Sequence, residues 1–190
     1  MLGFATARQP KTVVEIGTST GGTTFLLGAL LPTVTLLVGI DILVRNRQRL
    51  RAFARPGLET AFINGSSRAQ ATIEAVSAVL GDRPVDLLFI DGDHTFFGAS
   101  QDFRAYRRLV APGGLIAFHD IVPDSTLRSG SDALTWSGEV PVLWEILRTQ
   151  FPSHEFVDSP DQEAFGIGVL EHQPAVEPRF VPARQAEIAR

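Results

Sequence analysis

The sequence predicts an α/β fold with a doubly wound, mostly parallel sheet that ends in a C-terminal antiparallel hairpin. Strand-like and helix-like segments alternate along most of the chain, and the strand-like segments are mostly apolar, without a regular polar alternation. Strands of that kind are buried on both faces, which indicates a parallel sheet covered by helices on both sides. Near the end of the chain, two strand-like segments are joined by a short polar loop, which indicates a hairpin.

The expected elements follow from hydrophobic periodicity and from helix stop signals. Strands are expected at 12–16, 33–41, 58–65, 85–91 and 115–120, with the hairpin strands at 154–158 and 164–172. Helices are expected at 22–31, 45–55, 67–81, 97–110 and 140–151. Pro32 ends the first of these helices, and Pro112-Gly113-Gly114 is expected to form a turn before the fifth strand.

Length and composition indicate a single domain, which we expect to span residues 1–172. The chain has 190 residues, 44% of them hydrophobic and 20% charged, which is the composition of a soluble globular protein. Residues 173–190 contain three prolines and show no clear period. We expect them to form a loose C-terminal tail, and an arm that packs on a partner subunit is the alternative.

Composition also argues against several classes of protein. No apolar run approaches the roughly 18 residues that would cross a bilayer. The first residues lack a signal-peptide pattern and cysteine is absent, so a cytoplasmic location is expected. A net charge of -4 argues against a nucleic-acid partner. The five arginines of residues 45–55 are expected to lie on a solvated helix face, with a phosphate-binding patch as the alternative.

Polar residues gather where the expected strands end. The groups are Glu15–Gly17, Asp41, Asn64-Gly65-Ser66, Asp91–His94 and His119-Asp120. Any one of them could simply cap a helix or form a turn. In open α/β sheets, however, ligands lie beyond the carboxyl ends of the strands. The five groups together therefore predict one binding site at that edge of the sheet.

The glycine-rich turn separates two classes of ligand. A dinucleotide fold uses G-x-G-x-x-G, whereas residues 17–22 read G-T-S-T-G-G and Ser19 takes the place of the second glycine. Glu15 suits a ligand with an ammonium group and would repel a pyrophosphate. The Asp41 carboxylate can accept hydrogen bonds from both hydroxyls of a ribose. The implied ligand has an amino-acid end, a ribose and no phosphate, which describes S-adenosylmethionine.

Four motifs between residues 12 and 172 carry a family resemblance: E-I-G-T-S-T-G-G-T-T, G-I-D, F-I-D-G-D-H-T-F and L-V-A-P-G-G-L-I-A-F-H-D-I. The chain resembles the class I S-adenosylmethionine-dependent methyltransferases, and most of all their cephalosporin-hydroxylase-like and macrolide sugar O-methyltransferase branch. The resemblance implies a seven-stranded Rossmann-like methyltransferase sheet whose last strand is inserted antiparallel. It also implies cofactor-binding residues, namely Glu15, Gly17, Thr18, Gly21, Thr23, Asp41, Asn64, Gly65, Ser66 and Asp91. Of these, Glu15, Gly17 and Thr23 would contact the methionine end, and Asp41 the ribose. The end of the third strand would contact the adenine, and Asp91 would lie near the reacting methyl group.

The related catechol-type O-methyltransferases carry D-x-x-K after strand four and D-N after strand five, where the acids and the amide hold magnesium and the lysine is the base. In this sequence Asp91 matches the first acid, His94 the lysine, and His119-Asp120 the D-N pair. The resemblance therefore implies Asp91 and His94 as catalytic residues, and Asp91, His119 and Asp120 as metal ligands. Histidine in place of a carboxylate favours a softer divalent metal than magnesium. Both histidines could instead be hydrogen-bonded scaffold residues.

We expect an S-adenosylmethionine-dependent methyltransferase that methylates a small-molecule hydroxyl, with or without a divalent metal. Methylation of a nucleic-acid base is disfavoured, because the strand-four motif lacks the proline-aromatic platform that grips a flipped base. The alternative is a non-catalytic binding module of the same fold that acts in a complex. It is suggested by the roughly eleven residues before the first strand, which also suggest a homo-oligomer.

Two further expectations concern the acceptor side. Residues 121–138 are long, polar and rich in turn formers, which predicts a lid. Trp136 could roof the substrate pocket. Trp144 is expected to pack in the core or at an interface. The sequence does not identify the acceptor.

Overall fold

The computed structural model describes residues 1–124, 137–159 and 161–180. Its seven strands form one sheet in the order β3-β2-β1-β4-β5-β7-β6. The strands are β1 (Thr12–Ile16), β2 (Leu36–Asp41), β3 (Glu59–Asn64), β4 (Val85–Ile90), β5 (Val110–His119), β6 (Ser153–Phe156) and β7 (Ile167–Glu171). The first five pair in parallel, whereas β7 pairs antiparallel with both β5 and β6. The predicted fold class is confirmed, including the antiparallel end.

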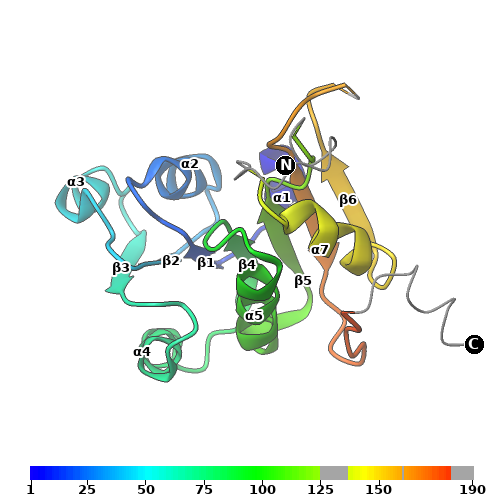
Figure 1. Cartoon of the computed structure of the whole chain (residues 1–190). Coiled ribbons are helices and arrows are strands. Elements are labelled where there is room, and N and C mark those ends of the chain that lie inside the picture. The colour runs from blue at the N-terminus through cyan, green and yellow to red at the C-terminus, as the bar shows by residue number, and fades with distance from the viewer. Residues whose placement is uncertain (125–136, 160, 181–190) are drawn as a thin grey trace, which may run out of the picture.

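Helices cover both faces of the sheet (Figure 1). They are α1 (Leu2–Ala7), α2 (Gly22–Leu30), α3 (Arg47–Ala52), α4 (Gln70–Leu80), α5 (Phe96–Tyr106), the short 3-10 helix η1 (Arg107–Leu109) and α7 (Val140–Leu147). Buried side chains of α4, α5 and α7 form the larger core with one face of the sheet. Those of α1 and α2 form a second core with the other face. None of the helices in the described ranges is long and apolar enough to cross a membrane.

Strand β1 shows why the sheet is sandwiched in this way. All five of its residues are buried. Val14 and Ile16 belong to the larger core, whereas Val13 belongs to the second core on the opposite face. Successive side chains of a strand point to opposite faces, so a strand buried on both faces is mostly apolar and lacks the polar alternation of a strand with one solvated face. Trp144 of α7 is 1% exposed and packs 6.2 Å from Phe118, which confirms its predicted place in the core.

Three local features differ from the sequence prediction. Helix α1 was not expected from the sequence. The arginine-rich helix, expected over 45–55, is the shorter α3, although Arg45, Arg49 and Arg51 are exposed as expected. Strand β5 begins at Val110, so the expected turn at 112–114 lies inside its bounds. The register with β4 moves from Val85↔Val110 to Leu87↔Leu115, so the Pro-Gly-Gly segment bulges out of the pairing.

The start of the C-terminal segment lies against the domain. The Arg107 guanidinium donates to the carbonyl oxygens of Gln173 (3.3 Å) and Val176 (2.6 Å). Val176 and Phe180 pack on the larger core. The sequence predicts a loose tail from residue 173. The structure differs over residues 173–180, because two apolar side chains pack on the core and two carbonyl oxygens accept hydrogen bonds from Arg107 of η1. Residues 181–190 lie outside the described part of the chain, and with them the rest of the predicted tail or arm.

Candidate active site

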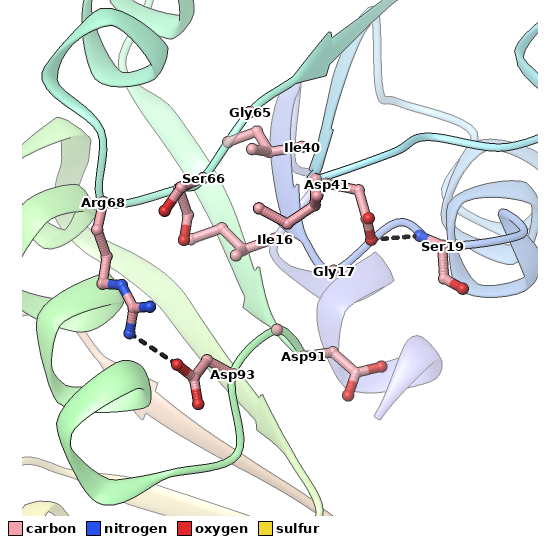
Figure 2. Close-up of a pocket in the computed structure, with 13 residues that line it drawn as sticks. Ile16, Gly17, Ser19, Ile40, Asp41, Gly65, Ser66, Arg68, Asp91 and Asp93 are labelled. Carbon is pink, nitrogen blue, oxygen red and sulfur yellow. Dashed lines mark hydrogen bonds and ion pairs between the residues drawn. The ribbon is translucent and has the colours of Figure 1, made fainter.

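A cavity of about 380 Å³ opens at the carboxyl ends of β1, β2, β3 and β4 (Figure 2). It lies where the strand order turns back, with β1 at the centre between β2 and β4, as ligand sites do in open α/β sheets. Its lining residues come from four strand ends and the loops that follow: Ile16, Gly17, Ser19, Ile40, Asp41, Ile42, Gly65, Ser66, Ser67, Arg68, Asp91, Gly92 and Asp93. The structure thus brings together the groups that the sequence placed at one edge.

The floor of the cavity depends on the absence of a side chain at Gly17. Its φ of +94° lies in the left-handed region, and its backbone crosses closely over the end of β4. A Cβ at this position would lie 1.9 Å from the carbonyl oxygen of Asp91 and 2.4 Å from its carbonyl carbon. Only glycine satisfies both the conformation and the close approach. The turn can therefore bring its backbone, and any ligand above it, next to Asp91.

Asp41 holds a fixed position at the rim of the cavity. One carboxylate oxygen accepts a hydrogen bond from the Ser19 amide at 2.8 Å, as Figure 2 shows, and the other accepts from the Leu43 amide at 2.9 Å. An ionised carboxylate has about four acceptor positions, so two remain for a ligand. This geometry suits the predicted contact with a pair of ribose hydroxyls.

Glu15 lies beneath the glycine turn and does not line the cavity. It is 1% exposed and accepts hydrogen bonds from the hydroxyls of Thr18 (3.1 Å) and Thr24. Burial raises the pKa of its carboxyl to about 7, against the lowering effect of the two threonine hydroxyls. Thr24, and not the half-buried Thr23, is the α2 threonine that contacts this acid. A change in the charge of Glu15 would therefore affect a ligand in the cavity through the glycine turn, because the carboxyl group does not itself touch the cavity.

The predicted cofactor residues fall into two sets. Gly17, Asp41, Gly65, Ser66 and Asp91 line the cavity, whereas Glu15, Thr18, Gly21, Thr23 and Asn64 are not among its lining residues. Asn64, for example, accepts a hydrogen bond from the Val44 amide at 3.0 Å and so holds the loop after β2. Which of the first set contacts a cofactor stays a prediction.

Sequence reasoning missed two polar residues of the wall, Ser67 and Arg68. The Arg68 guanidinium forms an ion pair of 2.7 Å with Asp93 (Figure 2), which joins the loop after β3 to the loop after β4. Ser67 donates a hydrogen bond of 2.6 Å to Asp102 of α5. Their position next to a predicted strand end could have identified them as wall residues. Their partners could not be predicted from the sequence, because Asp93 and Asp102 are 25 and 35 residues away in the chain.

Two histidines and two aspartates form a cluster at one side of the cavity. The Asp91 Oδ1 atom is 3.2 Å from both His94 Nε2 and His119 Nδ1. Asp120 lies 3.4 Å from His94 Nδ1 and 3.2 Å from His119 Nδ1. The neighbouring carboxylates of Asp120 and Asp91 raise the pKa of His119 to about 10. Burial raises the pKa of Asp91, but the two histidines outweigh it and hold that pKa below its ordinary value.

The cluster fits a divalent cation. Asp91, His94 and Asp120 offer one ligand atom each within 4.8 Å of one another. His119 Nδ1 and Asp120 Oδ1 are buried, and although close in distance they have no partner with hydrogen-bond geometry in the described residues. Carboxylates mixed with imidazoles suit manganese, iron or zinc better than magnesium. Asp120 is a non-glycine residue at a φ of +60°, and such strain is common at functional sites.

The loop that carries His94 is fixed from the α7 side. The Glu139 amide donates to the His94 carbonyl oxygen at 2.7 Å, and the Glu139 carboxylate accepts from the Phe96 amide at 2.7 Å. The exposed Phe165 ring lies 6.3 Å from the His119 ring. Residues 125–136 of the predicted lid, and with them Trp136, lie outside the described residues.

Comparison of the sequence with known proteins gives two findings. A family model described as a methyltransferase domain matches residues 14–121. An uncharacterized protein, R132 of Acanthamoeba polyphaga mimivirus, is 34% identical over 119 residues, which are 60% of this chain and 52% of that protein. The aligned region thus spans about half the length of this curated relative.

Solved structures share the fold at low sequence identity. Cofactor-bound Rv0187 from MTB superposes with a TM-score of 0.67 at 18% identity, covering 90% of this chain and 76% of that one. An O-methyltransferase from Bacillus cereus in complex with SAH gives a TM-score of 0.66 at 15% identity, with coverages of 90% and 78%.

Proposed function

Because the chain belongs to the methyltransferase domain family, we propose that it transfers the methyl group of S-adenosylmethionine to a hydroxyl group of a small molecule. Membership of that family confirms the resemblance found in the sequence. The Bacillus cereus relative of the same fold is an O-methyltransferase that was solved with the demethylated cofactor, and this supports the choice of cofactor and of acceptor atom.

One observation carries the proposal: Asp91 belongs both to the cavity and to the histidine-aspartate cluster. A ligand with its ribose at Asp41 and its amino-acid end over Gly17 would bring its sulfonium to the Asp91 side. An acceptor hydroxyl placed at the cluster would then face the methyl group. The cavity supplies a place for the donor, and the cluster supplies groups that can hold an acceptor and receive its proton.

When bound, S-adenosylmethionine supplies an electrophilic methyl group: the sulfur–carbon bond breaks as the oxygen–carbon bond forms, and the acceptor loses its proton. The chain's own part is to align the two reactants and to accept that proton. His94 is the base we propose. Both of its ring nitrogens face carboxylates, at 3.2 Å from Asp91 and 3.4 Å from Asp120, so a proton on either nitrogen is stabilised by a neighbouring acid.

The alternative role that we propose for the cluster is to bind a divalent metal through Asp91, His94 and Asp120, with His119 beside them. A metal there would lower the pKa of an acceptor hydroxyl and orient it. The support is the pair of buried atoms that lack hydrogen-bond geometry, together with the mixed donor set. If His94 is a ligand, it cannot also be the base, so the metal and the base at His94 are alternative roles for this residue.

The experiment is a methyl-transfer assay with labelled S-adenosylmethionine and a panel of sugars and phenols. We expect a labelled methyl ether with at least one hydroxyl acceptor, and no product with Asp91→Asn. A second arm adds EDTA and then magnesium, manganese or zinc. Loss and recovery of product support the metal, and indifference contradicts it. Tight binding of S-adenosylhomocysteine without transfer to any acceptor of the panel would argue against O-methylation and in favour of the non-catalytic binding module.

A further inference from the structure

Asp102 of α5 is a buried carboxyl group directly behind the cavity wall. It is 0% exposed, and its Oδ1 atom accepts the hydrogen bond of the Ser67 hydroxyl at 2.6 Å. Its Oδ2 atom is buried with no hydrogen-bond partner in the described residues. That atom lies behind Gly92, since a Cβ on Gly92 would be 3.4 Å from it. Ser67 and Gly92 both line the cavity, so the carboxyl group backs the wall at two points.

A buried carboxyl group with one unpaired oxygen is costly for folding. Burial raises the pKa of Asp102 to about 6, with the Ser67 hydrogen bond and Arg68 acting in the opposite direction. An asparagine or an apolar residue would fill the same space with less desolvation of charge. Groups that are retained at such a cost next to a cavity are candidates for a functional role.

The hydrogen bond to Asp102 decides whether the Ser67 hydroxyl can donate a hydrogen bond to a ligand or only accept one. An ionised carboxylate only accepts hydrogen bonds, so the Ser67 hydroxyl must give its single proton to Asp102. The Tyr106 hydroxyl donates to the Ser67 carbonyl oxygen at 2.9 Å and holds the backbone in place. The serine oxygen therefore has only lone pairs left for a ligand. It can accept a hydrogen bond from the cavity side but cannot donate one.

We propose that Asp102 acts through Ser67 as a positioning residue that makes the cavity select adenine over a purine with an oxygen in place of the exocyclic amino group. The inference rests on the proposed cofactor. With the ribose at Asp41 and the methionine end over Gly17, the base is left with the remaining wall, formed by Gly65–Arg68 and Gly92-Asp93.

The two bases present opposite groups to Ser67. The amino group of adenine donates a hydrogen bond, which the serine oxygen accepts. The carbonyl oxygen of hypoxanthine only accepts, so it would bring lone pairs against lone pairs and leave the serine unpaired. A mismatch of this kind at a partly buried site lowers affinity by about ten- to a hundredfold.

The test is calorimetric titration at pH 8 with S-adenosylhomocysteine and with S-inosylhomocysteine. We expect the wild type to bind the adenosyl compound about ten- to a hundredfold more tightly. In Asp102→Asn the amide can donate to the serine oxygen and free the hydroxyl proton for the ligand. The preference should then fall to about fivefold or less, as it should in Ser67→Ala. In the double variant, Asp102→Asn should cause no further change, because Asp102 acts only through Ser67.

Tyr106→Phe is the matched control, since it removes the neighbouring hydrogen bond to the Ser67 carbonyl and leaves the hydroxyl–carboxylate pair intact. It should lower thermal stability and keep the wild-type preference. An unchanged preference in folded Ser67→Ala or Asp102→Asn would overturn the inference, and Ser67→Ala decides alone if the Asp102 variant does not fold. Failure of the wild type to bind either compound would instead overturn the proposed cofactor.

Discussion

Replacing Gly17 with alanine should destabilise the protein far more than the same change at Gly57. Both glycines have a positive φ, +94° and +83°, so both substitutions carry the left-handed penalty of about 1–2 kcal/mol. At Gly57 the new Cβ would meet nothing within 4 Å. At Gly17 it would lie 1.9 Å from the Asp91 carbonyl oxygen, a backbone atom that cannot rotate away.

Relief of that overlap requires the ends of β1 and β4 to move apart, which costs a further 1–3 kcal/mol, roughly, by analogy with overpacked cores. We therefore expect Gly17→Ala to lose about 2–5 kcal/mol of unfolding free energy and Gly57→Ala about 1–2 kcal/mol. Both substitutions also lower the conformational entropy of the unfolded chain, and this stabilising effect cancels when the two variants are compared. The assay is urea unfolding followed by circular dichroism. Equal losses in the two variants would refute the argument that the turn needs a close backbone approach.

Three further predictions concern the buried acid, the base and the metal. Burial raises the pKa of Glu15 from 4.5 in the unfolded chain to about 7 in the folded protein, so the carboxyl group ionises first in the unfolded state and stability falls as the pH rises from 4.5 to 7. The wild type should lose about 3 kcal/mol more stability than Glu15→Gln across that window, and parallel pH profiles would contradict this. His94→Ala should lower turnover on the order of 10²–10⁴ with cofactor affinity nearly unchanged, whereas His154→Ala, remote on β6, should leave turnover intact. A fully active His94→Ala protein would remove the base assignment. Manganese or zinc should raise the melting temperature of the wild type and not that of Asp120→Asn, and equal shifts would place the metal elsewhere.

The sequence predicted those parts of the fold and site that depend on local pattern. Mostly apolar strands such as Val85–Ile90 can be recognised because both faces of the sheet are covered. Asp41 and Asp91 were identified because parallel strands end at one edge, and both line the cavity. The hairpin at the end of the chain was identified from its short polar loop, and β6 pairs antiparallel with β7.

The remaining features depend on contacts between distant residues. Helix α1 has six residues, too few for periodicity to be recognised, and its place comes from packing of Ala5 in the second core. The choice of Thr24 over Thr23 depends on the rotation of α2 above Glu15. The Ser67–Asp102 pair joins the loop after β3 to α5. Nothing local in either segment specifies such a pair, because it is set by the packing of the helix on the sheet.

Calorimetric titration with S-adenosylhomocysteine and with NAD tests the central claim most directly, with wild type, Asp41→Ala and the control Glu59→Ala. Glu59 begins the edge strand β3 and pairs with Arg83 at 3.0 Å, and it is not part of the cavity lining. The account predicts that the wild type binds S-adenosylhomocysteine and not NAD. It also predicts that Asp41→Ala weakens binding by about 10- to 100-fold through loss of hydrogen bonds to a charged group, while Glu59→Ala has no effect. Preferential binding of NAD, or equal affinity in Asp41→Ala, would contradict the account.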